Sequence, residues 1–235
     1  MNSKILIVED EKDLNELVKR YLEKEGYEVR SYLTYEEASA HTSDDDVHCW
    51  ILDIMLDDKS GFDLIEEIRM QSPEVPVVFM SARDKEFDRI IGLEKGSDDY
   101  ITKPYNPMEL VARVKAMLRR YLALGTLAGA PARENVVTLG GLSLDLDEKQ
   151  LTVDGAPVRL TATEYRIVAL LMQNPGRVYN AEEIYERVWN EPGFSVENTV
   201  MVHIRRIREK IEINPKNPKY LKVVWGLGYK MEKAQ

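Results

Sequence analysis

The chain has 235 residues, a formal net charge of −9 and a hydrophobic fraction of 44%. This composition excludes a disordered or collagen-like chain, and no apolar run approaches the roughly 18 residues that a membrane-spanning helix needs. The single cysteine, Cys49, excludes an internal disulfide framework. Because the N-terminus also lacks the pattern of a secretory signal, we expect a cytoplasmic protein without a membrane partner.

The charge is divided unevenly along the chain. Residues 1–121 hold 17 basic and 27 acidic residues, whereas residues 196–235 hold 9 basic and 4 acidic ones. Residues 124–135 are rich in small residues, Gly and Pro, and lack an apolar stripe, which is typical of a linker. The sequence therefore predicts domains at 1–121 and 137–235 joined by a flexible linker at 122–136. The basic C-terminal tract keeps nucleic-acid binding open despite the negative total charge.

The first domain alternates short apolar runs with amphipathic segments. Residues 4–8 are apolar, and apolar side chains then recur at helical spacing from Leu14 to Leu22, before Gly26. Further elements are predicted in this order: strand 27–33, helix from 35, strand 49–55, helix 61–71, strand 75–82, helix 86–95, strand 99–102 and helix 107–120. Apolar strands separated by helices indicate an α/β fold, with a doubly wound parallel five-stranded sheet.

Chemically active side chains follow the predicted strands. Glu9 and Asp10 follow the first strand, Asp53 ends the third, Ser81 ends the fourth and Lys103 follows the fifth. Because ligands bind beyond the carboxyl ends of the strands in such sheets, we expect these five side chains to share one edge.

Three neighbouring carboxylates repel one another unless a proton or a cation compensates them. A hard divalent cation such as Mg²⁺ accepts oxygen ligands and keeps positions open for phosphate oxygens. Lys103 and the hydroxyl of Ser81 are suited to bind a phosphate group. This set is therefore suited to a carboxylate that attacks phosphorus.

Four motifs resemble the receiver domain of two-component response regulators: EDE at 9–11, LDIML at 52–56, SAR at 81–83 and DDYITKP at 98–104. The resemblance covers 1–121 and implies a flavodoxin-like fold with strand order 2-1-3-4-5. It also implies that Asp53 accepts a phosphoryl group from a sensor histidine kinase.

The resemblance implies a role for each residue of the site. Mg²⁺ would be held by Glu9, Asp10, Asp53 and the backbone carbonyl of Met55. Ser81 and Tyr100 match the hydroxyl and the aromatic residue of the phosphorylation switch, and Lys103 matches the phosphate-binding lysine, followed by a cis bond to Pro104. One departure is that Asp57, followed by Asp58, stands where the family commonly has Pro.

Charged residues of complementary sign occur between 89 and 120. Their plain interpretation is a solvated surface of mixed charge, to which exposed pairs contribute little stability. In regulators of the OmpR/PhoB type, the matching positions form ion pairs between the two copies of a dimer. Carried over to this chain, the pairs are Arg89 with Glu109, Asp98 with Arg120, Asp99 with Arg113, and Glu94 with Lys115. We therefore expect a homodimer on phosphorylation.

The second half predicts a smaller α+β domain. Three short strands (LSLDL, QLTV and PVRL) begin within 137–159, and Thr161 or Thr163 is placed to cap the helix that follows. A helix at 181–189, an amphipathic helix within 195–214 and a hairpin at 221–231 complete the domain. The third helix carries clustered arginines, which fit the major groove of DNA; the alternative is a cationic surface helix.

This domain resembles the winged-helix effector of the OmpR/PhoB family through LTATEY at 160–165, NTVMVHIRRIREKI at 198–211 and WGLGYK at 225–230. Thr199, His203, Arg206 and Arg208 match family DNA contacts, whereas Asn198 and Trp225 stand where some members have arginine. The predicted DNA-binding residues are Asn198, Thr199, His203, Arg205, Arg206, Arg208, Lys210, Lys222, Trp225 and Lys230.

Together these features predict a response regulator that is phosphorylated on Asp53, dimerises, binds double-stranded promoter DNA and acts on RNA polymerase. The segments WILDIML and GLEKGSDDYI look most like cell-envelope or antibiotic stress regulators of the CssR or VanR kind. One alternative is a Mg²⁺-dependent phosphohydrolase, although Met55 stands where a second general acid would be needed. Another is a regulator whose DNA binding ignores phosphorylation.

Overall fold

The computed structural model describes residues 3–57, 59–82, 86–125, 135–193 and 196–233, without the side chains of 86–89, 120 and 123–125. The chain divides into two compact units, Met1–Leu122 and Ala123–Gln235. The segment expected as a linker, 122–136, overlaps both neighbouring elements, because α5 (Pro107–Gly125) continues into it and β6 (Val136–Leu139) starts at its end. Asp58 and residues 126–134 lie outside the described residues.

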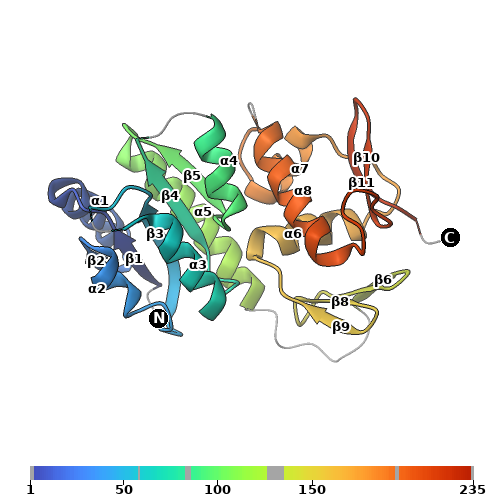
Figure 1. Cartoon of the computed structure of the whole chain (residues 1–235), viewed down its shortest axis with the longest axis horizontal. Coiled ribbons are helices and arrows are strands. Elements are labelled where there is room, and N and C mark those ends of the chain that lie inside the picture. Colours follow the sequence, from blue (N-terminus) through green and yellow to red (C-terminus); the bar gives the residue numbers. More distant parts are fainter. Residues whose placement is uncertain (1–2, 58, 83–85, 126–134, 194–195, 234–235) are drawn as a thin grey trace. The chain divides into compact units, whose positions relative to one another are not determined.

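The first unit is a parallel sheet of five strands in the order β2-β1-β3-β4-β5 (Figure 1). This is the order that the sequence resemblance implied. The strands are β1 (Lys4–Val8), β2 (Glu28–Tyr32), β3 (Val47–Asp53), β4 (Val77–Ser81) and β5 (Asp99–Thr102). The helices between and after them are α1 (Lys12–Lys24), α2 (Tyr35–Ser39), α3 (Gly61–Gln71), α4 (Glu86–Glu94) and α5.

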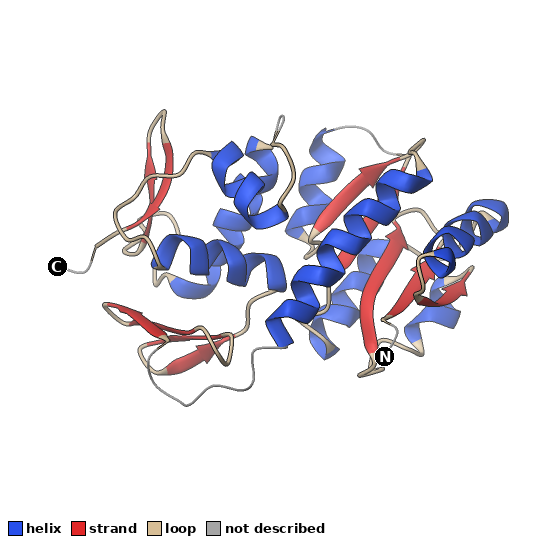
Figure 2. Cartoon of the chain, turned by 180° about the vertical axis from the view of Figure 1, so that it is seen from behind, coloured by secondary structure: helices blue, strands red, loops and turns tan. Residues whose placement is uncertain are grey.

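Helices cover both faces of this sheet (Figures 1 and 2). Alternate side chains of a strand point to opposite faces, so Ile5 and Ile7 of β1 pack with α1 and α5, whereas Leu6 and Val8 pack with α2 and α3. All four side chains are fully buried. Burial on both faces explains why the inner strands β1 and β4 are apolar except for Lys4 and Ser81 at their ends.

The second unit begins with an antiparallel sheet of four strands. These are β6, β7 (Leu142–Asp145), β8 (Gln150–Val153) and β9 (Ala156–Val158). The sequence predicted the last three, with slightly different ends, but missed β6. The reason is that β6 has only four residues, and its sequence VVTL does not alternate strictly between polar and apolar residues.

Three helices and a hairpin follow: α6 (Ala162–Met172), α7 (Ala181–Trp189), α8 (Glu197–Ile211), β10 (Leu221–Val224) and β11 (Gly228–Met231). Thr161, and not Thr163, caps α6, in a capping box with Glu164. A second capping box, Asn180 with Glu183, starts α7. The buried side chains of α6, α7, α8 and the strands form one apolar core, and the predicted α+β class is confirmed.

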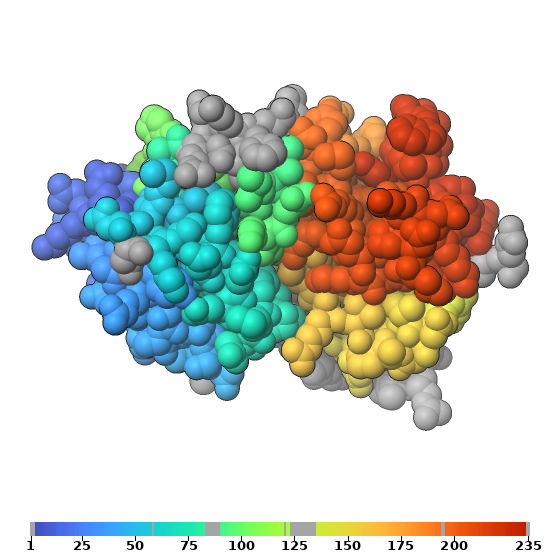
Figure 3. Space-filling model, in the orientation of Figure 1, coloured from blue at the N-terminus to red at the C-terminus, as the bar shows by residue number. Residues whose placement is uncertain are grey.

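The antiparallel strands β10 and β11 are joined by a β-turn, and this hairpin projects from the surface of the unit (dark red in Figures 1 and 3). Its tip carries the exposed apolar side chains of Trp225 and Leu227, with 88% and 64% of their surface exposed. Across the described residues, no helix combines the length and the apolar character needed to cross a bilayer.

Candidate functional site

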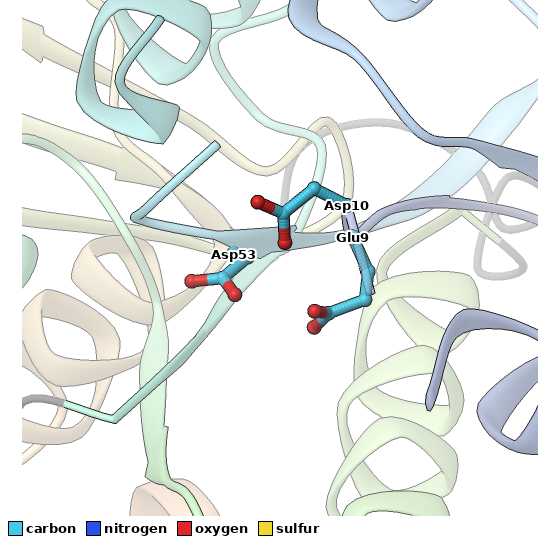
Figure 4. A group of neighbouring side chains, drawn as sticks. All are labelled: Glu9, Asp10 and Asp53. Atoms are coloured by element: carbon cyan, nitrogen blue, oxygen red, sulfur yellow. The ribbon is translucent and has the colours of Figure 1, made fainter. Parts of the chain in front are cut away.

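Three carboxylates meet at the carboxyl ends of β1 and β3 (Figure 4). One oxygen from each of Glu9, Asp10 and Asp53 lies within 4.8 Å of the others. Glu9 and Asp53 are buried, whereas Asp10 is half-buried. The sequence prediction that these acids converge at one edge is thus confirmed.

Lys103, the residue that follows β5, contacts this cluster. Its Nζ donates a hydrogen bond to Glu9 Oε1 at 2.8 Å and to Asp53 Oδ2 at 2.5 Å. Burial disfavours the charged amine, but the bonds to Asp53 and Glu9 outweigh it and raise the pKa of Lys103. Burial, reinforced by the charge of Asp53 and opposed by Lys103, raises the pKa of Glu9 to about 7. The Lys103–Pro104 bond is cis, as the resemblance implied.

The raised pKa of Glu9 reflects the burial of its carboxylate and the negative charge of Asp53 beside it, which Lys103 offsets only in part. Carboxylate oxygens at this spacing are the donor set that Mg²⁺ prefers. The residues present therefore fit a magnesium ion held by Glu9, Asp10 and Asp53. The backbone carbonyl of Met55 stays a predicted fourth ligand; the Met55 N–H donates to Asp53 Oδ1 at 2.9 Å.

Two residues that the sequence analysis overlooked hold this edge of the sheet. Asn15 is buried in α1, and its side chain donates to the carbonyls of Glu9 and Tyr32, both at 2.9 Å. A Cβ on Gly61 would lie 2.0 Å from the carbonyl oxygen of Asp53, so only glycine allows α3 to begin there. Asn15 lies on the buried stripe of α1, with Val18 and Leu22. A polar residue on an apolar stripe is the sequence signal from which its role could have been predicted.

The two predicted switch residues lie on neighbouring strands. Ser81 is fully buried at the end of β4, and its carbonyl accepts the N–H of Lys103 at 2.7 Å. Tyr100 of β5 is 5% exposed and packs in the core with Phe79. A Cβ on Gly92 of α4 would lie 3.1 Å from the Tyr100 ring, so the glycine leaves room for this inward position.

The predicted dimer residues divide into exposed and buried ones. Glu94, Glu109 and Lys115 are exposed, whereas the side chains of Arg89 and Arg120 lie outside the described residues. Arg113 Nη1 bonds to Asp99 Oδ2 at 3.0 Å, and Arg113 Nη2 bonds to Glu109 Oε1 at 3.0 Å. Lys115 pairs with Glu25 at 2.9 Å. In this structure, therefore, the expected partners Asp99 and Arg113 are paired within one chain.

Asp98 requires a correction. Its side chain is 1% exposed, and Oδ2 accepts both Arg69 Nη2 at 2.9 Å and the N–H of Val77 at 3.0 Å. A carboxylate that is buried and used in this way is not placed to pair with Arg120 of another copy. Asp98 instead fixes α3 to the start of β4.

Two of the predicted DNA-binding residues of α8, Thr199 and His203, are buried, with 2% and 0% of their surface exposed. The ring of His203 lies 5.3 Å from that of Trp189. Burial, reinforced by the charges of Arg206 and Lys210, lowers the pKa of His203 to about 3. A DNA contact through either side chain therefore requires a conformation other than this one. Arg205 is exposed and Asn198 is half-buried.

Arg208 of α8 and Glu212, the residue that follows this helix, bind protein groups. Arg208 Nε donates to the carbonyl of Leu221 at 2.9 Å, which fastens α8 to β10. Glu212, just after α8, accepts the N–H groups of Lys219, Tyr220 and Leu221 at 2.6–2.8 Å. Arg208 thus holds the hairpin in this structure, and its contact with DNA stays a prediction.

Arg206 and Lys210 lie on one face of α8, a turn apart, and both pair with buried Glu164 of α6. The sequence analysis did not predict this role of Glu164, because no local pattern indicates a partner about forty residues away. On the hairpin, Trp225 is exposed, whereas Lys222 and Lys230 are half-buried and bond to the Pro218 carbonyl and to Glu232.

The fold and the acidic site define a receiver domain that is followed by a winged-helix DNA-binding domain. Family models agree: residues 5–115 match "Response regulator receiver domain" and residues 155–231 match "Transcriptional regulatory protein, C terminal". The chain belongs to the two-component response regulators of the OmpR/PhoB type, which are DNA-binding transcriptional regulators and not enzymes.

Similar proteins match along the whole chain. The regulatory protein VanR of Enterococcus faecium is 41% identical over 99% of this chain and 100% of its own length. The uncharacterized transcriptional regulatory protein YcbL of Bacillus subtilis strain 168 is 40% identical over 96% of this chain and 99% of its own. The crystal structure of the response regulator DrrB, a Thermotoga maritima OmpR/PhoB homolog, matches with 31% identity and a TM-score of 0.52, covering 99% of this chain and 100% of DrrB.

Proposed function

We propose that this protein is a phosphorylation-controlled transcription factor of the cytoplasm. A sensor histidine kinase phosphorylates Asp53, the receiver domain dimerises, and the paired winged helices bind promoter DNA and act on RNA polymerase. The observation that carries this proposal is the position of Asp53: it lies beside two further carboxylates and bonds to Lys103.

Asp53 is the only one of the three acids on β3, and its carboxylate is the proposed nucleophile. Its attack on the phosphorus of a phosphohistidine forms an O–P bond, and the N–P bond breaks as the electron pair returns to the imidazole. Bound Mg²⁺ would compensate negative charge on the acids and on the transferring phosphoryl group. Lys103 Nζ then binds a phosphate oxygen in place of the Asp53 oxygen that it holds now, and the Ser81 hydroxyl donates to another.

The new charge at the end of β3 would act on the neighbouring strands, where Ser81 and Tyr100 lie. We propose that the effect of this charge on Ser81 and Tyr100 favours a receiver dimer that forms through α4, β5 and α5. Its interface residues are Arg113, Glu109, Asp99, Glu94 and Lys115. A two-fold dimer must be self-complementary, and this face carries both signs of charge. Dimerisation places two α8 helices on one DNA molecule, so avidity raises occupancy without new base contacts.

The test is genome-wide footprinting of purified protein on genomic DNA, with and without acetyl phosphate and Mg²⁺. Wild-type protein should protect discrete sites that become occupied at lower protein concentration after phosphodonor treatment. Asp53→Ala should protect the same sites without responding to the phosphodonor. Equal occupancy of wild-type protein under both conditions would refute phosphorylation control, and an absence of discrete sites would refute sequence-specific DNA binding.

A further inference from the structure

A buried carboxylate contacts the recognition helix of the second unit. Glu164 is fully buried in the first turn of α6, where it completes the capping box: its Oε2 accepts the N–H of Thr161 at 2.8 Å. The same oxygen accepts Lys210 Nζ at 2.5 Å, and Oε1 lies 3.1 Å from Arg206 Nη2 in an ion pair without hydrogen-bond geometry. One carboxylate therefore faces two cations of α8.

The electrostatic surroundings keep Glu164 ionised. Burial disfavours the charged carboxylate, but Arg206 and Lys210 outweigh it and lower the pKa of Glu164 below its ordinary value. The N-terminus of α6 also favours negative charge at this position. The side chain of Arg206 is 12% exposed and that of Lys210 is 31% exposed, so neither cation presents its full charge to solvent.

The cations of α8 are thus not equivalent. Arg205 is 63% exposed and forms a surface ion pair at 3.1 Å with Glu209, an exposed residue of the same helix. Such a surface pair is easily exchanged for a phosphate. To contact a phosphate, Arg206 and Lys210 must instead break their ion pairs with Glu164. This would leave the buried Glu164 carboxylate unpaired, which is unfavourable in free energy.

We propose that Glu164 is a positioning residue that holds Arg206 and Lys210 away from DNA phosphates and so restrains sequence-independent binding. The inference rests on the proposed DNA-binding function and deepens it. Sequence-independent binding is driven by phosphate neutralisation and counterion release. Because these two cations are withheld from phosphates, non-specific affinity is lower. The fixed orientation of Arg206 is retained for a site that offers a matching base.

The experiment measures binding of the full chain to a 30-base-pair duplex of random sequence by fluorescence anisotropy, across a salt series. Glu164→Gln removes the charge but keeps a residue that serves in a capping box. It should raise affinity about tenfold at 0.1 M salt and steepen the slope of log K against log salt by 1–2, because each added phosphate contact contributes about 0.9.

Glu183→Gln is the matched control, because Glu183 occupies the same place in the capping box of α7 and contacts no cation of α8 among the described residues. It should leave the slope unchanged. Adding Lys210→Met to Glu164→Gln should remove about one unit of the added slope. A purely structural role of Glu164 would change the melting temperature and not the slope, and an unchanged slope in a folded Glu164→Gln protein overturns the proposal.

A second measurement does not depend on the folding of a Glu164 variant. In the otherwise unchanged chain, Lys210→Met should hardly alter the salt slope, whereas Arg205→Met should reduce it by about one. Equal reductions would overturn the proposal, because Lys210 would then contact phosphate freely. Wild-type protein that binds no duplex at low salt would overturn the DNA-binding function itself, which separates that failure from the failure of the inference.

Discussion

Arg113 Nη1 lies 3.0 Å from Asp99 Oδ2 within one chain. The OmpR/PhoB resemblance pairs the same two residues across a dimer. A dimer of that kind must exchange the internal pair for an external one, so its net gain is the difference between two similar bonds. A small free-energy change at the phosphorylation site is therefore enough to shift the equilibrium from monomer to dimer.

Replacing Arg113 by Ala should weaken the phosphorylated dimer. By two-fold symmetry the external pair is lost twice, while each monomer also loses its internal pair; with each external pair exceeding the internal one by about 0.2–1 kcal/mol, the dissociation constant should rise roughly 2- to 30-fold. Analytical ultracentrifugation with acetyl phosphate and Mg²⁺ measures this. Arg119→Ala, at an exposed position of the same helix, is the control. An unchanged constant for Arg113→Ala would exclude this residue from the interface.

Arg69→Met should destabilise the receiver domain, because it leaves the buried Asp98 carboxylate without its cation. Breaking a buried pair from one side costs about 3–5 kcal/mol. Chemical denaturation measures the loss. Arg20→Met, which removes an exposed pair with Glu16, should cost less than about 1 kcal/mol. If Arg69→Met cost no more than this control, the structural role given to Asp98 would be wrong.

Glu212→Ala should loosen the hairpin at its base. It removes the acceptor of three backbone N–H groups, those of Lys219, Tyr220 and Leu221. The donors of Tyr220 and Leu221 are buried, and each buried donor left unpaired costs about 1–3 kcal/mol, so a loss of about 2 kcal/mol or more is expected in thermal unfolding. Amide hydrogen exchange should accelerate at 219–221 in particular. Glu209→Ala, an exposed position three residues earlier, should change neither measurement.

His203 should make stability depend on pH. Its folded-state pKa is lowered to about 3, so the unfolded chain, with an ordinary histidine, binds more protons below about pH 6.5. Stability from this group is therefore complete at pH 7.5 and falls as pH decreases, by about 2 kcal/mol at pH 5. His203→Phe should flatten the profile of unfolding free energy between these values. A profile as steep as that of wild-type protein would contradict the burial of a neutral imidazole.

The sequence predicted what local patterns determine. Apolar runs that end in Asp53 or Ser81 indicate both a buried strand and a polar residue at its end, and the strand order came from the family resemblance. The misplaced residues depend on tertiary contacts. Asp98 looks like one of two equivalent acids before Tyr100, and only the position of Arg69 distinguishes it from Asp99. Glu164 and Arg206 are forty-two positions apart, so no helical spacing reveals their pairing.

The central claim is that Asp53 accepts a phosphoryl group at a site completed by Glu9, Asp10 and Lys103. Intact-mass spectrometry after incubation with acetyl phosphate and Mg²⁺, followed by peptide mapping, tests it most directly. Wild-type protein should gain the mass of one phosphoryl group, mapped to Asp53, and should gain none when EDTA replaces Mg²⁺ or when Asp53 is changed to Asn. Labelling that persists in Asp53→Asn, or wild-type protein that is never labelled, would contradict the account.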